Sequence, residues 1–375
     1  MQNILIRPFL IIVLLTCLAS SAIAEDDRTD TRPGIAPDIR EDETKLKVQR
    51  GNFVVVPIPI SNPTLDSGLV VGGAYFYPQT EEQKKAQPAS LTALGGLYTS
   101  NDSRAVVIAQ QNYWKNDRWR FTGALGGADL RLSLLAPDET SDGSSVDWRI
   151  RGAFLFAKLS RRIKGDWYGG VFTRVVDAKQ SIATIEEDTE SEFALGDETS
   201  SGLGAVFEYD ARDNPFYSTS GRYFKIDALF NDEAIGSDQT YQSYSGAFRS
   251  YHKMSDSVVL AWELQACRRG GTAPLWDACT IKLRGFSATD YLGKVSASGQ
   301  AEARWQLSKR WGLVGFAGSG FFGGSFNDFR SREAIPSYGA GVRFSVLPAK
   351  RINLRVDFAR SRDSDAIHVS VGEAF

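Results

Sequence analysis

Histidine and cysteine are scarce in this sequence, which has two histidines and three cysteines among 375 residues. The histidines, His252 and His368, have no serine and carboxylate companions in the sequence, so we expect no enzyme activity. So few imidazole and thiol groups also argue against a metal site, and we expect no cofactor. The net charge of −2 gives no general attraction to nucleic acid, so we expect no such partner.

Long hydrophobic runs are also missing after the first 24 residues. The rest of the chain has no run of about 18 apolar residues, the length that a transmembrane helix needs. The first 24 residues carry Arg7, an apolar stretch over 9–18, and the small-residue site Ala22-Ile23-Ala24. An uncleaved anchor is the alternative, but the stretch is short for a span. We therefore predict a secretory signal peptide at 1–24.

Export places the two remaining cysteines, Cys267 and Cys279, in an oxidising compartment. We predict a disulfide between them, which would close a short loop. The alternative is a pair of free thiols.

Residues 25–51 are charged, contain Pro33 and Pro37, and lack periodicity, which predicts a flexible arm. Residues 52–375 are instead rich in short alternating segments bounded by turn residues. We predict about sixteen strands in this part of the chain. They are expected at 52–60, 67–78, 90–100, 103–114, 118–130, 149–161, 166–177, 202–211, 221–231, 240–251, 256–267, 295–307, 311–321, 337–347, 351–360 and 366–375.

The connections between these segments alternate in length. Short turns and long loops on opposite sides are typical of outer-membrane barrels, whose short turns face the periplasm. The short links are 115–117, 162–165, 252–255, 308–310 and 348–350. The long ones are 131–148, 178–201, 268–294 and 322–336.

Charged and apolar side chains alternate within the segments. In 351–358, Leu354 and Val356 share one face, and Arg355 and Asp357 share the other. A soluble β-sandwich would bury the apolar face, whereas a barrel in lipid would turn that face outward. Aromatic residues near the expected strand ends favour the membrane, because such residues form girdles at both interfaces. These are Tyr77, Trp114, Trp119, Trp148 and Trp311. We therefore predict an all-β fold, a transmembrane antiparallel β-barrel.

The loop 268–294 contains an arginine, Arg284, followed by Gly285 and Phe286. If this loop folds into the barrel, Arg284 must meet a carboxylate, because an unpaired buried charge is very costly. Glu302 and Asp357 lie on the predicted inward faces of later strands. We expect Arg284 to contact one or both, since a guanidinium forks onto carboxylates. The alternative is a solvated arginine in an exposed loop.

A second notable stretch is the turn that links the expected strands 202–211 and 221–231. It contains an aspartate-rich sequence and ends on a glycine. Its residues of interest are Asp210, Arg212, Asp213, Asn214 and Gly221. Asp-Asn-Pro is also common turn chemistry with no further role, and this alternative stays open.

The first and last strands are the third notable feature. Pro57 and Pro59 remove two backbone donors from one edge of the first strand, which is tolerable where pairing is weak. That edge would face the last strand, which ends in the aromatic Phe375. We infer a weak seam there, with the alternative that the prolines simply precede the barrel.

The arginine-glycine-phenylalanine loop, the aspartate-rich turn and the closing strands resemble the BamA/TamA family of outer-membrane assembly barrels, the bacterial surface antigen family. The resemblance covers about residues 52–375, and Ser218 stands where the family's turn has proline. It implies that the sixth extracellular loop folds into the lumen, with its arginine on acidic wall residues, and that the seam is a lateral gate. Family members usually carry polypeptide-transport-associated (POTRA) repeats before the barrel, and residues 25–51 are too few for one.

The resemblance implies a protein of the Gram-negative outer membrane that assists insertion or transport of proteins. Its partners would be outer-membrane lipids, unfolded outer-membrane or secreted proteins, and the barrel-assembly machinery as its own folding catalyst. Two alternatives remain. One is a passive or gated pore, and the other is a structural surface-antigen barrel without an assembly role.

Overall fold

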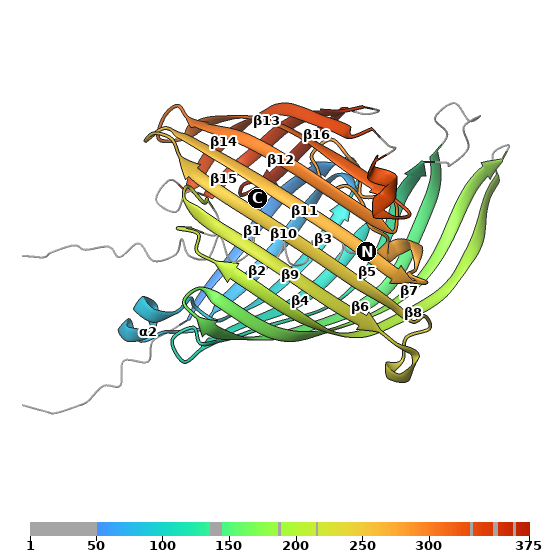
Figure 1. Cartoon of the computed structure of the whole chain (residues 1–375), viewed down its shortest axis with the longest axis horizontal. Coiled ribbons are helices and arrows are strands. Elements are labelled where there is room, and N and C mark those ends of the chain that lie inside the picture. The colour runs from blue at the N-terminus through green and yellow to red at the C-terminus, as the bar shows by residue number, and fades with distance from the viewer. Residues whose placement is uncertain are drawn as a thin grey trace, which may run out of the picture.

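Sixteen antiparallel strands form a closed barrel in the computed structural model (Figure 1). The structure describes residues 51–135, 145–186, 189–214, 217–330, 333–347, 352–362 and 365–375. Each strand pairs with its neighbours in sequence, and β16 meets β1 to close the ring. The predicted fold class and strand number are confirmed. Within the described residues, no helix is long and apolar enough to cross a bilayer.

The strands are β1 (Asn52–Asn62), β2 (Asp66–Phe76), β3 (Leu91–Thr99), β4 (Arg104–Trp114), β5 (Trp119–Leu135), β6 (Ser145–Lys164), β7 (Trp167–Glu186), β8 (Thr189–Asp210), β9 (Gly221–Asn231), β10 (Tyr241–Lys253), β11 (Val258–Gly271), β12 (Val295–Gln306), β13 (Trp311–Gly323), β14 (Ile335–Leu347), β15 (Ile352–Ser361) and β16 (Asp365–Val371). One short helix, α2 (Glu81–Ala86), follows β2. Three 3-10 turns are the remaining elements of the described residues: η1 (Glu233–Ile235), η2 (Leu275–Asp277) and η3 (Phe326–Arg330).

Two of the expected long loops are strand throughout the residues that the structure describes. β7 and β8 are 20 and 22 residues long, and their hairpin extends beyond the rest of the wall in Figure 1. The expected loop 178–201 is therefore mostly paired backbone, as is much of 131–148 between β5 and β6. These strand ends extend beyond the part of the wall that faces lipid, so neither of their faces needs apolar residues. The alternation of apolar and polar residues that predicts a strand is therefore missing there.

The last strand is shorter than expected. β16 ends at Val371, whereas the sequence predicted a strand to residue 375. Gly372 adopts φ +91°, a left-handed backbone that favours glycine, and its N–H donates to the carbonyl of Asn353 at 2.8 Å. The tail then packs inside the barrel, with Phe375 against Tyr251 and Ala261.

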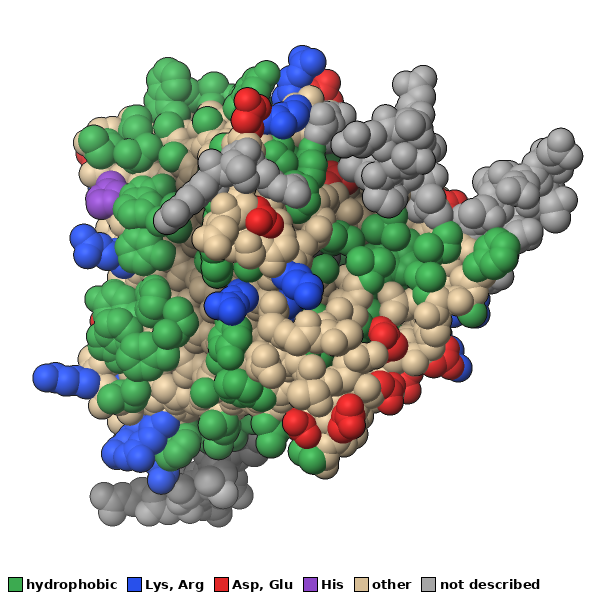
Figure 2. Space-filling view, turned by 45° about the vertical axis from the view of Figure 1, so that its right-hand side comes forward, with side chains coloured by type: hydrophobic (Ala, Val, Ile, Leu, Met, Phe, Trp, Pro, Cys, Tyr) green, Lys and Arg blue, Asp and Glu red, His purple; other side chains and the backbone are tan. Residues whose placement is uncertain are grey.

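The wall has its apolar side chains outside and its charges inside. In β12, Glu302 and Arg304 are 1% and 2% exposed, whereas Trp305 is 53% exposed. Figure 2 shows broad apolar areas on the outer surface. This distribution is that of a barrel in lipid, not of a soluble sandwich. Trp114 and Trp311 face outward, as predicted for an aromatic girdle. The prediction is wrong for Trp148, because its side chain is buried in the lumen.

Candidate functional site

The connection between β11 and β12, residues 272–294, lies across the lumen; we call it the lumen loop. Its Asp277 meets Arg174 of β7, its Arg284 meets Asp357 of β15, and its Thr289 donates to the carbonyl of Ser133 in β5. These strands lie on different sides of a closed barrel. The loop can touch all of them only from inside, as the inward-folded loop of the prediction requires.

Arg284 is the centre of the contacts that the loop makes with β12 and β15. Its Nη1 donates to Asp357 Oδ2 at 3.0 Å, and its Nη2 donates to Glu302 Oε2 at 2.6 Å. Gln300 Oε1 accepts from both Nε and Nη2, and the guanidinium lies 3.5 Å from the ring centroid of Phe316. Arg284 is 6% exposed. Both expected carboxylates are its partners, so the solvated alternative is wrong.

Three further residues extend this contact into an arginine–carboxylate network. Arg304 Nε donates to Glu302 Oε1 at 2.6 Å, and Arg343 Nη1 donates to Asp357 Oδ1. Arg343 Nε also binds Glu373 Oε2 at 2.7 Å. We define the network as Arg284, Glu302, Arg304, Arg343, Asp357 and Glu373. Desolvation of each charge is offset by several partners, so loss of any one leaves the others buried and incompletely paired.

The two residues after Arg284 fix the loop tip. The Gly285 N–H donates to Nε2 of His368 in β16 at 2.9 Å. Phe286 is buried in an apolar cluster with Ile281 and Ile335, and its ring packs edge-on to Tyr291 at 5.7 Å between centroids. The tip thus contacts the last strand directly, and apolar burial adds to the ionic contacts.

The first part of the lumen loop has an anchor that the sequence did not suggest. Asp277 is fully buried and accepts from Arg174 at 2.6 and 3.0 Å and from Arg269 at 3.2 Å. Burial disfavours its charge, but the two guanidinium groups hold the pKa of Asp277 well below its usual range. The separation of 103 residues between Asp277 and Arg174 left no local signal for this pair.

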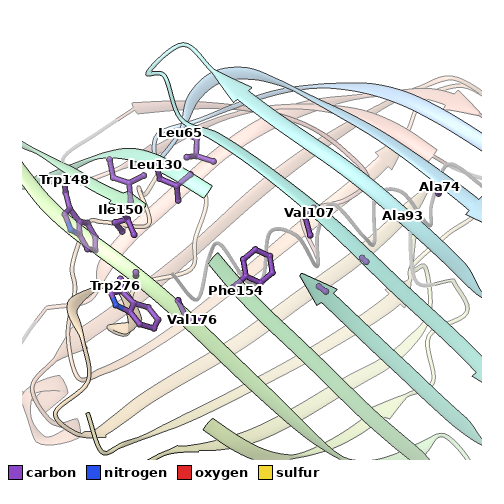
Figure 3. Close-up of a cluster of buried hydrophobic side chains, with 14 of the residues drawn as sticks. Leu65, Ala74, Ala93, Val107, Leu130, Trp148, Ile150, Phe154, Val176 and Trp276 are labelled. Atoms are coloured by element: carbon purple, nitrogen blue, oxygen red, sulfur yellow. The ribbon is translucent and has the colours of Figure 1, made fainter. Parts of the chain in front are cut away.

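A disulfide and a tryptophan support the same anchor. Cys267 and Cys279 are bonded, with 5.6 Å between their Cα atoms, so the predicted disulfide is confirmed. Trp276 is 2% exposed and joins an apolar cluster on the inner wall with Ile150 and Val176 (Figure 3). The loop therefore begins on a rigid base against β6 and β7.

The last part of the lumen loop reaches the first hairpin. The Ala288 N–H donates to Oγ1 of Thr64 at 2.7 Å, and the Ser287 hydroxyl donates to the same atom at 3.3 Å. Thr64 lies in the β1–β2 turn and is 8% exposed. Through Thr64 and His368, one loop contacts both ends of the sequence of strands.

The aspartate-rich turn is ordered by its own side chains. Arg212 forks onto Asp210 at 2.7 and 2.8 Å, and Asn214 Oδ1 accepts from the Tyr217 N–H at 3.2 Å. Burial opposes the charge of Asp213, but hydrogen bonds from Thr219 and its neighbours hold the pKa of that carboxyl below its usual value.

This turn also reaches the network inside the barrel. Gly221 has φ +100°, and a Cβ there would lie 2.1 Å from the carbonyl oxygen of Ala211, so only glycine fits. The Ser218 carbonyl accepts from Arg304 at 3.1 Å, and Arg304 also donates to the Phe375 carbonyl at 2.8 Å. The turn is thus more than a local reversal of the chain, because Arg304 joins it both to the network and to the tail.

The seam between β1 and β16 has very little pairing. The register records one pair there, Ser61 with Val369, whereas β1 pairs with β2 along its whole length from Asn52 to Asn62. Pro57 and Pro59 lie within β1 with exposed side chains, so they belong to the barrel and do not precede it. Phe375 was predicted at the seam, and this is wrong. The turn at Gly372 takes it instead to the inner face of β10 and β11.

The fold resembles two solved barrels. BamA from Haemophilus ducreyi lacking POTRA domains 1–3 superposes with a TM-score of 0.56 and 12% sequence identity, covering 87% of this chain and 70% of that one. CdiB from Acinetobacter baumannii gives 0.55 and 13%, covering 85% of this chain and 59% of that one. Identities this low establish the fold alone. No curated protein sequence matches significantly.

The sequence itself matches the Omp85 superfamily domain over residues 85–375. This match includes the lumen loop, the arginine–carboxylate network and the aspartate-rich turn. It extends over most of the barrel and agrees with the strand order. The same match confirms the prediction that the chain is not an enzyme. The chain belongs to the Omp85 superfamily of outer-membrane β-barrels.

Proposed function

We propose that this protein assists the insertion or transport of other proteins at the outer membrane of a Gram-negative bacterium. The observation that carries the proposal is the seam, where β1 and β16 share a single pair. An incompletely paired strand edge offers its backbone N–H and C=O groups to an incoming strand. A substrate strand that adds to this edge satisfies its own hydrogen bonds as it enters lipid.

The same proposal assigns the segments of the chain. Residues 1–24 are the cleaved signal peptide, 25–51 are a periplasmic arm, and 52–375 are the barrel. The short turns face the periplasm and the lumen loop enters from outside. Outer-membrane lipids surround the barrel, unfolded outer-membrane or secreted proteins are its substrates, and the barrel-assembly machinery folds it.

A cysteine pair across the seam tests this function. Ser61→Cys with Val369→Cys links the paired positions, and Ala205→Cys with Ala228→Cys links the β8–β9 pair as a matched control. Each variant replaces the wild-type protein in cells, and the outer-membrane proteome is measured with and without reductant. We expect the seam pair to deplete specific barrels or secreted proteins, with recovery on reduction, and the control pair to have no effect.

Two results would contradict this proposal. One is an unchanged outer-membrane proteome in cells that lack the protein. The other is equal activity of the two oxidised cysteine pairs, which would mean that the seam does not open. Both can be read from the same cells.

A passive pore is a second candidate, favoured by ion pairs that line the lumen. Lys158 binds Glu208 at 3.0 Å, and Arg249 binds Glu263 at 2.6 Å. Planar-bilayer recordings of the intact barrel and of one lacking residues 272–294 distinguish the candidates. Because the lumen loop crosses the barrel, the assembly proposal expects low conductance that rises on deletion, whereas a pore conducts steadily when intact.

A further inference from the structure

A cationic cavity lies between the β4–β5 and β6–β7 turns, at the end of the barrel with short connections. Its volume is about 600 Å³. The lining residues are Lys115, Asn116, Arg118, Arg161, Arg162, Ile163 and Lys164. Five of the seven are lysine or arginine, and none is acidic. This concentration of charge lies outside the lumen and takes no part in the network there.

The backbone around the cavity is held in one conformation. Lys115, Asn116 and Asp117 all have positive φ, at 53°, 59° and 61°. Gln87 Oε1 accepts from the Asn116 N–H at 3.1 Å, and the Arg162 N–H donates to the Arg118 carbonyl at 2.8 Å. The two turns are thus joined directly, and the cationic side chains start from a fixed frame.

The carboxylate of Asp117, which lies in the chain between the lining residues Asn116 and Arg118, is already used for structure. Asp117 is 5% exposed and binds Arg120 and Arg162, with 2.7 Å between its Oδ2 and Arg162 Nη2. Burial opposes its charge, but Arg120 and the other donors hold the pKa of Asp117 below its usual value, so it stays ionised. In the part of the chain that the structure describes, no carboxylate lies within salt-bridge distance of the other four cations. These are Lys115, Arg118, Arg161 and Lys164.

The cavity adjoins the apolar outer surface. Ile163, one of its lining residues, is 64% exposed, and the guanidinium of Arg161 lies 5.5 Å from the ring centroid of Trp119. Trp114 and Leu159 are also exposed nearby on the strands, at 44% and 40%. Tryptophan, exposed aliphatic side chains and arginine together are typical of the level at which lipid chains give way to headgroups.

We propose that this cavity binds the phosphate of an anionic phospholipid in the periplasmic leaflet. Arginine and lysine donate several charge-assisted hydrogen bonds to phosphate oxygens, and the acyl chains would lie on the apolar wall beside Ile163. An acidic protein segment could also bind these cations. Its binding would not explain why exposed tryptophan and isoleucine side chains lie beside them. The inference uses the outer-membrane setting but does not depend on the seam or on a substrate protein.

Native mass spectrometry of the purified, full barrel tests the proposal. The variant K115Q/R118Q/R161Q/K164Q removes the four unpaired cations. The matched control K85Q/R222Q/K309Q/R310Q removes four exposed cations from α2, from the start of β9 and from the β12–β13 turn. Each protein is released from mixed micelles that contain phosphatidylglycerol or phosphatidylethanolamine, and bound lipid is counted. We expect phosphatidylglycerol retention to fall about tenfold or more in the cavity variant only, since each cation near a membrane surface contributes substantially to anionic lipid binding.

Additional arms identify the ligand and check the fold. Inorganic phosphate is added at rising concentration, and gel mobility before and after heating reports whether each variant remains a folded barrel. Retention that resists phosphate supports a lipid site. The proposal is overturned by equal loss in both variants, by equal retention of the two lipids, or by displacement with phosphate alone. Binding of a synthetic acidic peptide in preference to phosphatidylglycerol would also overturn it.

Discussion

Two regions of the barrel wall differ in how completely their strands are paired. Around β6, β7 and β8, the long wall, strands of 20 to 22 residues are paired nearly end to end. At the seam, β16 has seven residues and one pair with β1. Backbone hydrogen bonds hold the long wall, whereas lumen side chains support the strands beside the seam. The lumen loop reaches both sides, through Asp277 at the long wall and through Arg284 beside the seam.

The largest effect is expected from Arg284→Ala. It leaves Glu302 and Asp357 buried without one of their cations, which costs about 3–5 kcal/mol. We expect hydrogen exchange of β15 and β16 amides to rise strongly while β7 and β8 change little. Arg360→Ala, which removes a 60% exposed side chain from β15, is the control. Uniform acceleration over all strands would show that the two sides are not separately supported.

Asp277→Asn tests the anchor on the long wall. It leaves Arg174 and Arg269 facing each other without a carboxylate, so we expect a loss of about 3 kcal/mol. The loss should appear as a lower midpoint in urea unfolding. Because the long wall is held by its own ladder, exchange at β7 should stay slow, and the loop should become sensitive to protease. Protection of the loop equal to wild type would contradict this assignment.

Removing the disulfide should have a somewhat smaller effect. Cys267 and Cys279 are 12 residues apart, so the closed loop contributes about 3 kcal/mol or less. We expect Cys267→Ala with Cys279→Ala to lower the unfolding midpoint and to loosen the start of the lumen loop. The contacts of Arg284 at the seam side should persist, and reduction of the wild type should reproduce the result. Release of the whole loop would instead mean that its two anchors act as one unit.

Thr64→Val is expected to have the smallest effect. It keeps the shape of the side chain but removes the acceptor of the Ala288 N–H, at a cost of about 1–2 kcal/mol. Faster exchange should be confined to the β1–β2 turn and to residues after Phe286. Ser67→Ala, in the exposed start of β2, serves as the control. An increase that spreads along β1 would show that this single contact supports the seam.

The strands of the fold could be predicted because lipid outside and charge inside impose a period of two on the sequence. The prediction failed where that constraint ends, in the upper parts of β5 to β8, and at Gly372, where one residue turns the chain inward. A strand that stands in water on both faces has the composition of a loop.

The partners of Arg284 could be predicted because both carboxylates lie on strands with a clear inward face. The contacts of Asp277 with Arg174 and of Thr64 with Ala288 could not, because they join residues 103 and 224 positions apart and lie in no recognisable motif. Phe375 was placed at the seam on the assumption that the last strand continues to residue 375. The backbone conformation of Gly372 determines where the last strand ends, and the periodicity of the sequence carries no information about that conformation.

The contact between Ala288 and Thr64 also bears on the order of folding. It joins residues 224 positions apart, so the entropy lost in forming it is recovered only after the intervening strands are in place. Strands that are neighbours in sequence can pair early, because their pairing closes only a short loop. Docking of the lumen loop is therefore a late step, and for most of its assembly the barrel passes through states in which the side between β1 and β16 is still unbraced.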